Sequence, residues 1–231
     1  MLINRRNALM AGGAKLSAKS YVQDGLVVMW DGIENAGWEV DDPNATTWKD
    51  LTGNGYDLMS APANGWVDGG RNVKSAATNP AIAFSDNDIV SLSVCSSCIF
   101  EGSNDFISIT NNRKLYYYNN KKCFICMSST SWGPNLGLGV VPQSITIVFN
   151  FDHPPGDSYY YRNMAWYGDS AVQNYTREWV GSHTTSIGCP SYQKCSGVIH
   201  NVRIYSRALT ADEIAANYAV DKARFNLPDA T

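Results

Sequence analysis

The sequence has little charge, because Asp, Glu, Lys and Arg together make up 17% of its 231 residues while hydrophobic residues make up 44%. This balance excludes an intrinsically disordered chain. The net charge is −3, so the chain as a whole lacks the positive charge of a nucleic-acid-binding protein. It also lacks an apolar run long enough to predict a membrane span, and it shows no internal repeat.

Aromatic and turn-forming residues are plentiful, with 7 Trp, 13 Tyr and 19 Gly. Short apolar runs recur between turn residues, which is typical of a β-sandwich or barrel. The clearest strand is 144–151 (SITIVFNF), in which Ile145, Ile147 and Phe149 share one face. The length fits one large all-β domain whose core needs no disulfide or metal. Three tryptophans are predicted to lie in this core: Trp30, Trp48 and Trp66.

One helix is predicted near the C-terminus, within 206–225 (SRALTADEIAANYAVDKARF). Thr210 and Glu213 have the spacing of a capping box, and Leu209 and Ile214 that of a hydrophobic staple. The apolar stripe of this helix is only about two turns long. Such a helix is not stable alone, so it must pack on the sandwich through Leu209, Ile214 and Tyr218.

Both ends of the domain resemble laminin-G-like, concanavalin A-like domains. The resemblance rests on 197–225 (GVIHNVRIYSRALTADEIAANYAVDKARF), 24–37 (DGLVVMWDGIENAG) and 48–58 (WKDLTGNGYDL), and it covers about 21–60 and 195–227. It implies an all-β fold, an antiparallel jelly-roll β-sandwich whose first and last strands are adjacent. The C-terminal helix would then be a structural closing element.

A basic arm is predicted at 1–20 and the sandwich domain at 21–231. The arm contains Arg5, Arg6, Lys15 and Lys19 and no acid, whereas 24–60 carries eight acids against Lys49. The arm is expected to dock on an acidic surface of this chain or of a neighbouring subunit, or else to be a solvated tail. Its paired arginines and short apolar run also permit an export signal.

The arm and the short laminin-G-like domain together resemble structural proteins of gut bacteriophages and prophages. This resemblance implies a place on a virion or an extracellular surface, a homo-oligomer, and neighbouring virion or surface-assembly subunits as partners.

A catalytic role is not expected. Concanavalin A-like retaining glycosidases need two carboxylates a fixed distance apart, in the pattern Glu-x-Asp-x-x-Glu or Glu-x-Asp-x-Glu. The nearest segment here, 39–42 (EVDD), lacks the second Glu and runs into Pro43. Nothing in the sequence marks His153, His183 or His200 as the base of a nucleophilic serine, and His200 is expected to be packed within a strand.

Two segments have the composition of a sugar site, which combines an aromatic platform with a few polar groups. The predicted ligand-binding residues are Trp132, Asn135, His153, Asp157, Tyr159, Trp166 and Asp169. Trp132 is expected to be exposed, because Gly and Pro follow it. The alternative is that most aromatics fill the sandwich, since strand alternation in 158–167 would place half of them inside.

The function predicted is therefore a non-catalytic surface-binding module that recognises a glycan or cell-surface polysaccharide. The alternative is a structural virion component, in a capsid decoration, fibre or tail, anchored by the arm. A glycoside hydrolase is the less favoured third reading.

The resemblance to laminin-G-like domains implies a bound Ca²⁺, for which Asp31 and Glu34 are candidate ligands; the alternative is that these are solvated turn acids. Two Cys-x-x-Cys pairs, at 95–98 and 123–126, leave zinc binding open beside buried thiols acting as small hydrophobes. Cys189 and Cys195 flank a loop and could pair if oxidised.

Overall fold

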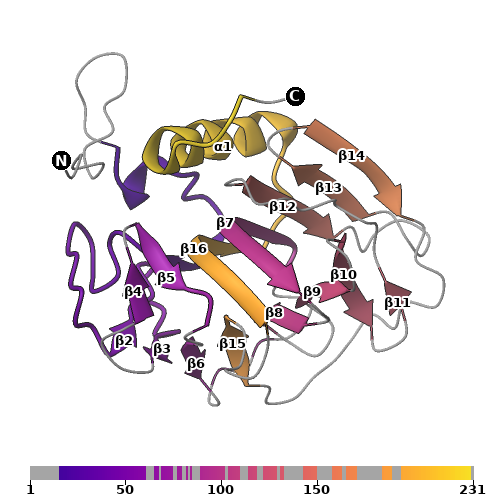
Figure 1. Ribbon diagram of the computed structural model, residues 1–231. Helices are drawn as coiled ribbons and strands as arrows, with labels where there is room; N and C mark the ends of the chain where they lie inside the picture. The colour runs from indigo at the N-terminus through magenta and orange to yellow at the C-terminus, as the bar shows by residue number, and fades with distance from the viewer. Residues whose placement is uncertain are drawn as a thin grey trace.

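The structure is a computed structural model. It describes residues 16–60, 65–67, 69–74, 77–79, 82, 84, 89–101, 104–109, 114–118, 122–128, 131–132, 143–149, 158–162, 165–170, 184–188 and 194–229. Within these ranges the chain forms two antiparallel sheets and one α-helix (Figure 1). The predicted all-β sandwich with a C-terminal helix is confirmed.

The strand order places the two ends of the chain in one sheet. The first sheet has the order β14 (Ala165–Ser170), β13 (Ser158–Arg162), β12 (Gln143–Phe149), β7 (Ser91–Glu101), β16 (Lys194–Tyr205), β5 (Gly70–Asn72) and β4 (Trp66–Val67), and β1 (Leu26–Asp31) also pairs with β16. The second sheet has the order β11 (Ser131–Trp132), β10 (Lys122–Ser128), β9 (Lys114–Tyr118), β8 (Asn104–Ser108), β15 (Thr185–Ile187), β6 (Ala77–Asn79), β3 (Leu58–Ser60) and β2 (Thr47–Trp48). The predicted adjacency of first and last strands is confirmed, since Val28 of β1 lies opposite Ile204 of β16.

The hydrophobic core lies between the two sheets. Ile145 and Ile147 are both fully buried in it, as the alternation of β12 predicts, and the side chain of Phe149 lies outside the described part. Trp30 and Trp48 are also fully buried there. Trp66 is partly buried and packs edge-on against Trp48, with 5.4 Å between the ring centroids. The core assignment of these three tryptophans is confirmed.

Helix α1 (Ala211–Phe225) packs on the outer face of the first sheet (Figure 1). The capping box is formed, because the Glu213 amide donates to Thr210 Oγ1 and the Thr210 amide donates to Glu213 Oε2. The staple residues Leu209 and Ile214 are buried together with Val148 of β12. These contacts confirm that the helix is held on the sandwich by the residues that begin it.

The segment before β1 packs against the same outer face. Leu16 and Ala18 are buried, and residues Ala18–Ser20 form a short 3₁₀ helix, η1. Lys19 is exposed, with Nζ 5.4 Å from the centroid of the Trp38 ring. The last residues of the predicted arm therefore belong to the folded domain, whereas Arg5, Arg6 and Lys15 lie outside the described residues.

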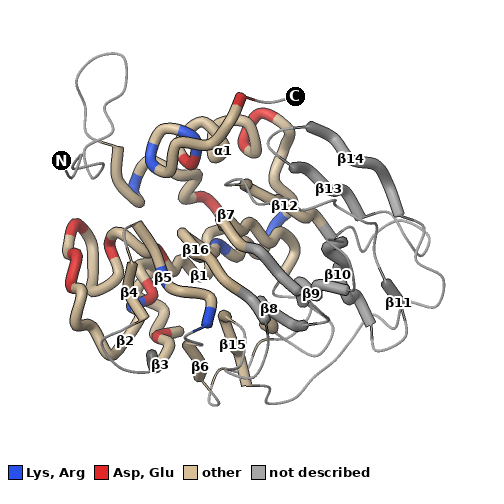
Figure 2. The backbone as a smooth tube through the Cα atoms, viewed as in Figure 1, with Lys and Arg blue, Asp and Glu red and all other residues tan. Residues whose placement is uncertain are grey.

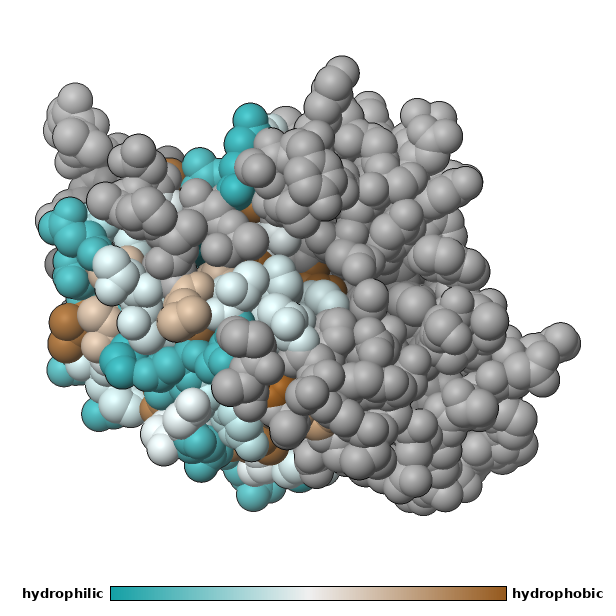
Figure 3. Space-filling view, turned by 90° about the horizontal axis from the view of Figure 1, so that it is seen from below, coloured by the Kyte–Doolittle hydropathy of each residue, from teal (hydrophilic) through white to brown (hydrophobic). Residues whose placement is uncertain are grey.

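The described surface is mixed in polarity. Charged residues gather on α1 and in the loops between β1 and β3 (Figure 2). Exposed large apolar side chains are scattered: Val40, Met59 and Val67. On the face seen from below, apolar colour appears in separate spots among polar residues (Figure 3). No helix in the described ranges is long and apolar enough to be a membrane span.

Candidate functional site

The predicted sugar-binding segment around Tyr159 folds as two antiparallel strands, β13 and β14, at one edge of the first sheet (Figure 1). Their register places Tyr159 opposite Asp169 and Tyr161 opposite Trp166. An irregularity in the pairing between these two positions places an additional residue in β14. Three predicted ligand-binding residues, Tyr159, Trp166 and Asp169, are thus brought together at a sheet edge.

β13 pairs with β12 along its other edge. Tyr159 lies opposite Val148, which is buried against α1, and Tyr160 lies opposite Ile147, which is in the core between the sheets. The side chains of β13 and β14 themselves lie outside the described part of the chain.

The other predicted aromatic, Trp132, lies in β11 at the edge of the second sheet, opposite Cys126. Both edge strands, β11 and β14, lie at the right-hand side of the molecule in Figure 1. The two tryptophans therefore belong to different sheets at the same side of the sandwich. The remaining predicted ligand-binding residues lie outside the described part of the chain: Asn135, His153 and Asp157.

The candidate calcium ligands, Asp31 and Glu34, do come together, but around an arginine. Arg224 donates to both oxygens of Asp31, over 2.6 and 2.9 Å, and to Glu34 Oε1 over 3.3 Å. Glu34 also accepts the amides of Ala18 and Glu39. Among the described residues, no group of three or more His, Cys, Asp or Glu side chains could hold a metal ion. Both carboxylates are thus engaged by the one positive charge of Arg224 and by backbone amides.

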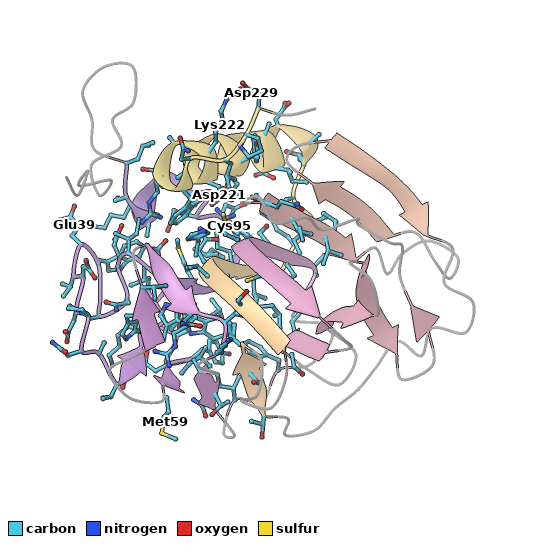
Figure 4. All side chains as sticks on the ribbon, in the orientation of Figure 1. Glu39, Met59, Cys95, Asp221, Lys222 and Asp229 are labelled. Atoms are coloured by element: carbon cyan, nitrogen blue, oxygen red, sulfur yellow. The ribbon has the colours of Figure 1, made fainter. Side chains whose placement is uncertain are left out.

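A buried polar layer beneath α1 was not predicted from the sequence. Its centre is Asp221, which lies between α1 and the first sheet (Figure 4). Oδ1 accepts from the Tyr21 hydroxyl at 2.7 Å and from the Asn201 amide at 2.9 Å, while Oδ2 accepts from Ser144 and from Arg203, both at 2.7 Å. The alternation of polar and apolar residues in 201–205 (NVRIY) was the sequence signal for this second, polar face.

The layer changes the acidity of its members. Burial raises the pKa of Tyr21 well above its ordinary value, and the negative charge of Asp221 raises it further. Burial alone would lower the pKa of Arg203, but the neighbouring Asp221 carboxylate raises it above its ordinary value. The Arg203 guanidinium also lies 4.0 Å from the centroid of the Tyr21 ring. The layer therefore holds the neutral phenol of Tyr21 beside the Arg203–Asp221 ion pair. This arrangement points to a structural role for the layer.

Cys95 and Cys98 lie on opposite faces of β7, as residues i and i+3 of a strand must. Cys95 packs with Tyr218 and Phe225 beneath α1, whereas Cys98 packs in the core between the sheets. Both are buried, and Cys98 Sγ donates to the carbonyl oxygen of Val198 over 3.4 Å. Burial raises the pKa of Cys95 well above its ordinary value. This pair therefore does not form a zinc-binding knuckle. The side chains of the other four cysteines lie outside the described part of the chain.

No protein-family model matches the chain, and no characterised protein matches it in sequence. Solved structures match its fold. A mutant of Trypanosoma rangeli sialidase displaying trans-sialidase activity superposes with a TM-score of 0.56 at 15% identity, over 92% of this chain and 35% of the sialidase. Botulinum neurotoxin type C, whose cell entry depends on interaction with two ganglioside molecules, superposes with a TM-score of 0.56 at 12% identity, over 87% of this chain and 51% of that one.

This chain thus spans about a third of the sialidase and about half of the neurotoxin chain. At such low identity the likeness concerns the fold: all of them contain a β-sandwich of this kind.

Proposed function

We propose that this chain is a carbohydrate-binding module whose sugar platform is the β13–β14 edge, and that this platform binds the sugar without cleaving it. The observation that carries the proposal is the register that unites Tyr159, Tyr161, Trp166 and Asp169 at one edge of the sheet. Aromatic rings stack on the apolar faces of sugars, and a carboxylate accepts hydrogen bonds from sugar hydroxyls. The pairing of Tyr159 with Asp169 and of Tyr161 with Trp166 along one pair of strands supports this edge as the platform.

The structural neighbours support a carbohydrate ligand. One of them interacts with gangliosides, which are glycolipids, and related sialidase structures contain sialic acid. A shared fold does not transfer an activity, because one sandwich carries many. That neighbours of this fold include proteins with carbohydrate ligands supports a carbohydrate ligand for this chain's own aromatic edge.

The hydrogen bonds of the buried acidic side chains support sugar binding rather than glycoside hydrolysis. The buried acids among the described residues are Asp31, Glu34, Asp50 and Asp221. Each accepts hydrogen bonds from arginine or from backbone amides of its own domain. A glycosidase instead needs two carboxyl groups free to face one glycosidic bond.

The proposal includes a setting on a virion or an extracellular bacterial surface, where such a module would attach its carrier to a polysaccharide. This setting is supported by the resemblance to laminin-G-like phage proteins and by the basic residues Arg5, Arg6 and Lys15, which precede the folded domain. The alternative is a structural subunit that binds no glycan.

A glycan array probed with the full-length protein, with and without calcium, tests the proposal. Trp166→Ala should weaken binding at least about tenfold, the loss expected for a central aromatic contact. Trp132→Ala tests whether the β11 edge of the second sheet contributes to binding as well. Met59→Ala is the matched control, because Met59 is 62% exposed and lies on β3 away from the β13–β14 edge (Figure 4).

Unchanged binding in Trp166→Ala would reject the β13–β14 platform. A blank array at high protein concentration would reject carbohydrate binding altogether and favour the structural alternative. Glycan binding that requires calcium would show that acidic residues in the turns act as calcium ligands.

A further inference from the structure

Ser97 and His200 form a hydrogen-bonded pair away from the β13–β14 edge. Ser97 lies on β7 and His200 on the neighbouring strand β16, 103 residues later, and Ser97 Oγ is 2.7 Å from His200 Nε2. The pairing of the two strands shifts between Ile199 and Asn201, so His200 is the additional residue of a β-bulge. Bulges redirect a side chain out of the regular alternation, and here the redirected side chain meets a serine.

The partners of the imidazole determine which nitrogen carries the proton. Nδ1 lies 2.9 Å from the carbonyl oxygen of Gly69, and a carbonyl oxygen can only accept. Nδ1 therefore holds the proton, and Nε2 of the neutral ring has a free lone pair. Ser97 must then be the donor of the second hydrogen bond. In an activated nucleophile, the serine hydroxyl donates to one nitrogen of a histidine, and a hydrogen bond at the other nitrogen fixes the orientation of the ring. Ser97 and His200 have this arrangement.

The surroundings keep His200 in the basic form. The ring is 8% exposed and stacks on Phe225, with 4.6 Å between the centroids. Burial lowers the pKa of His200 below its ordinary value, partly offset by the Gly69 hydrogen bond and by Asp221 of α1 and Asp31 of β1. The same two carboxylates favour the imidazolium that forms when the ring takes a proton.

Ser97 is partly exposed, whereas His200 is buried. Gly69 occupies the hairpin between β4 and β5 with φ +76°, a conformation that side chains rarely adopt. A Cβ at this position would stand 3.9 Å from His200 Nδ1, and glycine leaves that space open.

We propose that Ser97 is a nucleophile for carboxylic esters and that His200 is its general base. Ser97 Oγ attacks the ester carbonyl carbon while its proton passes to His200 Nε2. The bond from that carbon to the alcohol oxygen breaks, the leaving oxygen takes the proton from Nε2, and Ser97 carries the acyl group. Water then releases the acid by the same steps. This site is independent of the glycan proposal, since β12 separates β7 from β13.

A biotinylated fluorophosphonate tests the full-length protein directly. Ser97 Oγ should displace fluoride from phosphorus, and mass spectrometry of the digested protein should find the label on Ser97. The labelling rate should be constant from pH 7 to pH 9. It should decrease at pH values below the pKa of His200, because only the neutral ring acts as a base. An unassisted hydroxyl would instead react about tenfold faster per pH unit across that range.

Variants separate the roles. Ser97→Ala should abolish the label, and His200→Gln should slow labelling about 100-fold or more, the usual contribution of a general base. Ser96→Ala, one residue along β7, is the matched control and should label at the wild-type rate. Hydrolysis of p-nitrophenyl acetate should follow the same order.

Absence of label at Ser97, equal labelling of several serines, or a rate that rises tenfold per pH unit would overturn the proposal. If His200→Gln does not fold by circular dichroism, the pH profile of the wild-type protein decides the question.

Discussion

Replacing Asp221 by Asn should strongly destabilise the protein. The carboxylate accepts four side-chain hydrogen bonds, two on each oxygen. An asparagine keeps one accepting oxygen, so two buried donors lose their partner, and the Arg203 guanidinium loses its counter-charge. Arg203 is fully buried, and its Nε and Nη1 have no hydrogen-bond partner among the described residues.

The expected magnitude follows from this geometry. Breaking a buried ion pair by removing one partner costs about 3–5 kcal/mol in the free energy of unfolding. For a protein of this length each kcal/mol corresponds to about 2–4 °C, so the melting temperature should fall by about 6–20 °C. Removing both charges, in Asp221→Asn with Arg203→Met, should recover part of the loss because no uncompensated charge remains.

The assay is thermal and urea denaturation followed by circular dichroism. Asp212→Asn is the matched control, because Asp212 is an exposed acid in the first turn of the same helix and should contribute less than about 1 kcal/mol. An Asp221→Asn protein within about 0.5 kcal/mol of the wild type would refute the reasoning, since the polar layer would then contribute no net stability.

Two further predictions concern the ends of the chain. Hydrogen bonds from Arg207, and next from the Thr210 amide, lower the pKa of Glu213 to about 2. Since its unfolded value is about 4.3, the stability from Glu213 should be complete above pH 4.3 and lost between about 4.3 and 2. The melting temperatures of wild type and Glu213→Gln should therefore converge over that window, and parallel curves would contradict the assignment. Deleting residues 1–15 should change the assembly state in light scattering and leave the melting temperature nearly unchanged, whereas deleting 1–20 should also lower it because Leu16 and Ala18 are buried. An unaltered assembly state after deletion of 1–15 would exclude assembly through the arm.

Local patterns explain what could be predicted of the fold. The strand around Ile145 and Ile147 and the capping box of Thr210 and Glu213 depend on residues a few positions apart, so the sequence contains them completely. The aromatic segment around Tyr159 was likewise identified by composition. The pairing of Tyr159 with Asp169 was not, because it depends on a strand register that includes an irregularity.

Long-range partners are what the sequence could not supply. Asp31 and Glu34 were reasonable calcium ligands by composition, yet Arg224, 193 residues after Asp31, binds both. His200 had no evident partner until strand pairing and a bulge brought Ser97 to it. By itself the sequence determined the class of fold, the core faces and the terminal helix, because these follow from spacing along the chain. Only the tertiary structure decided which charges are neutralised and which serine meets a base, because these depend on the alignment of strands that are distant in sequence.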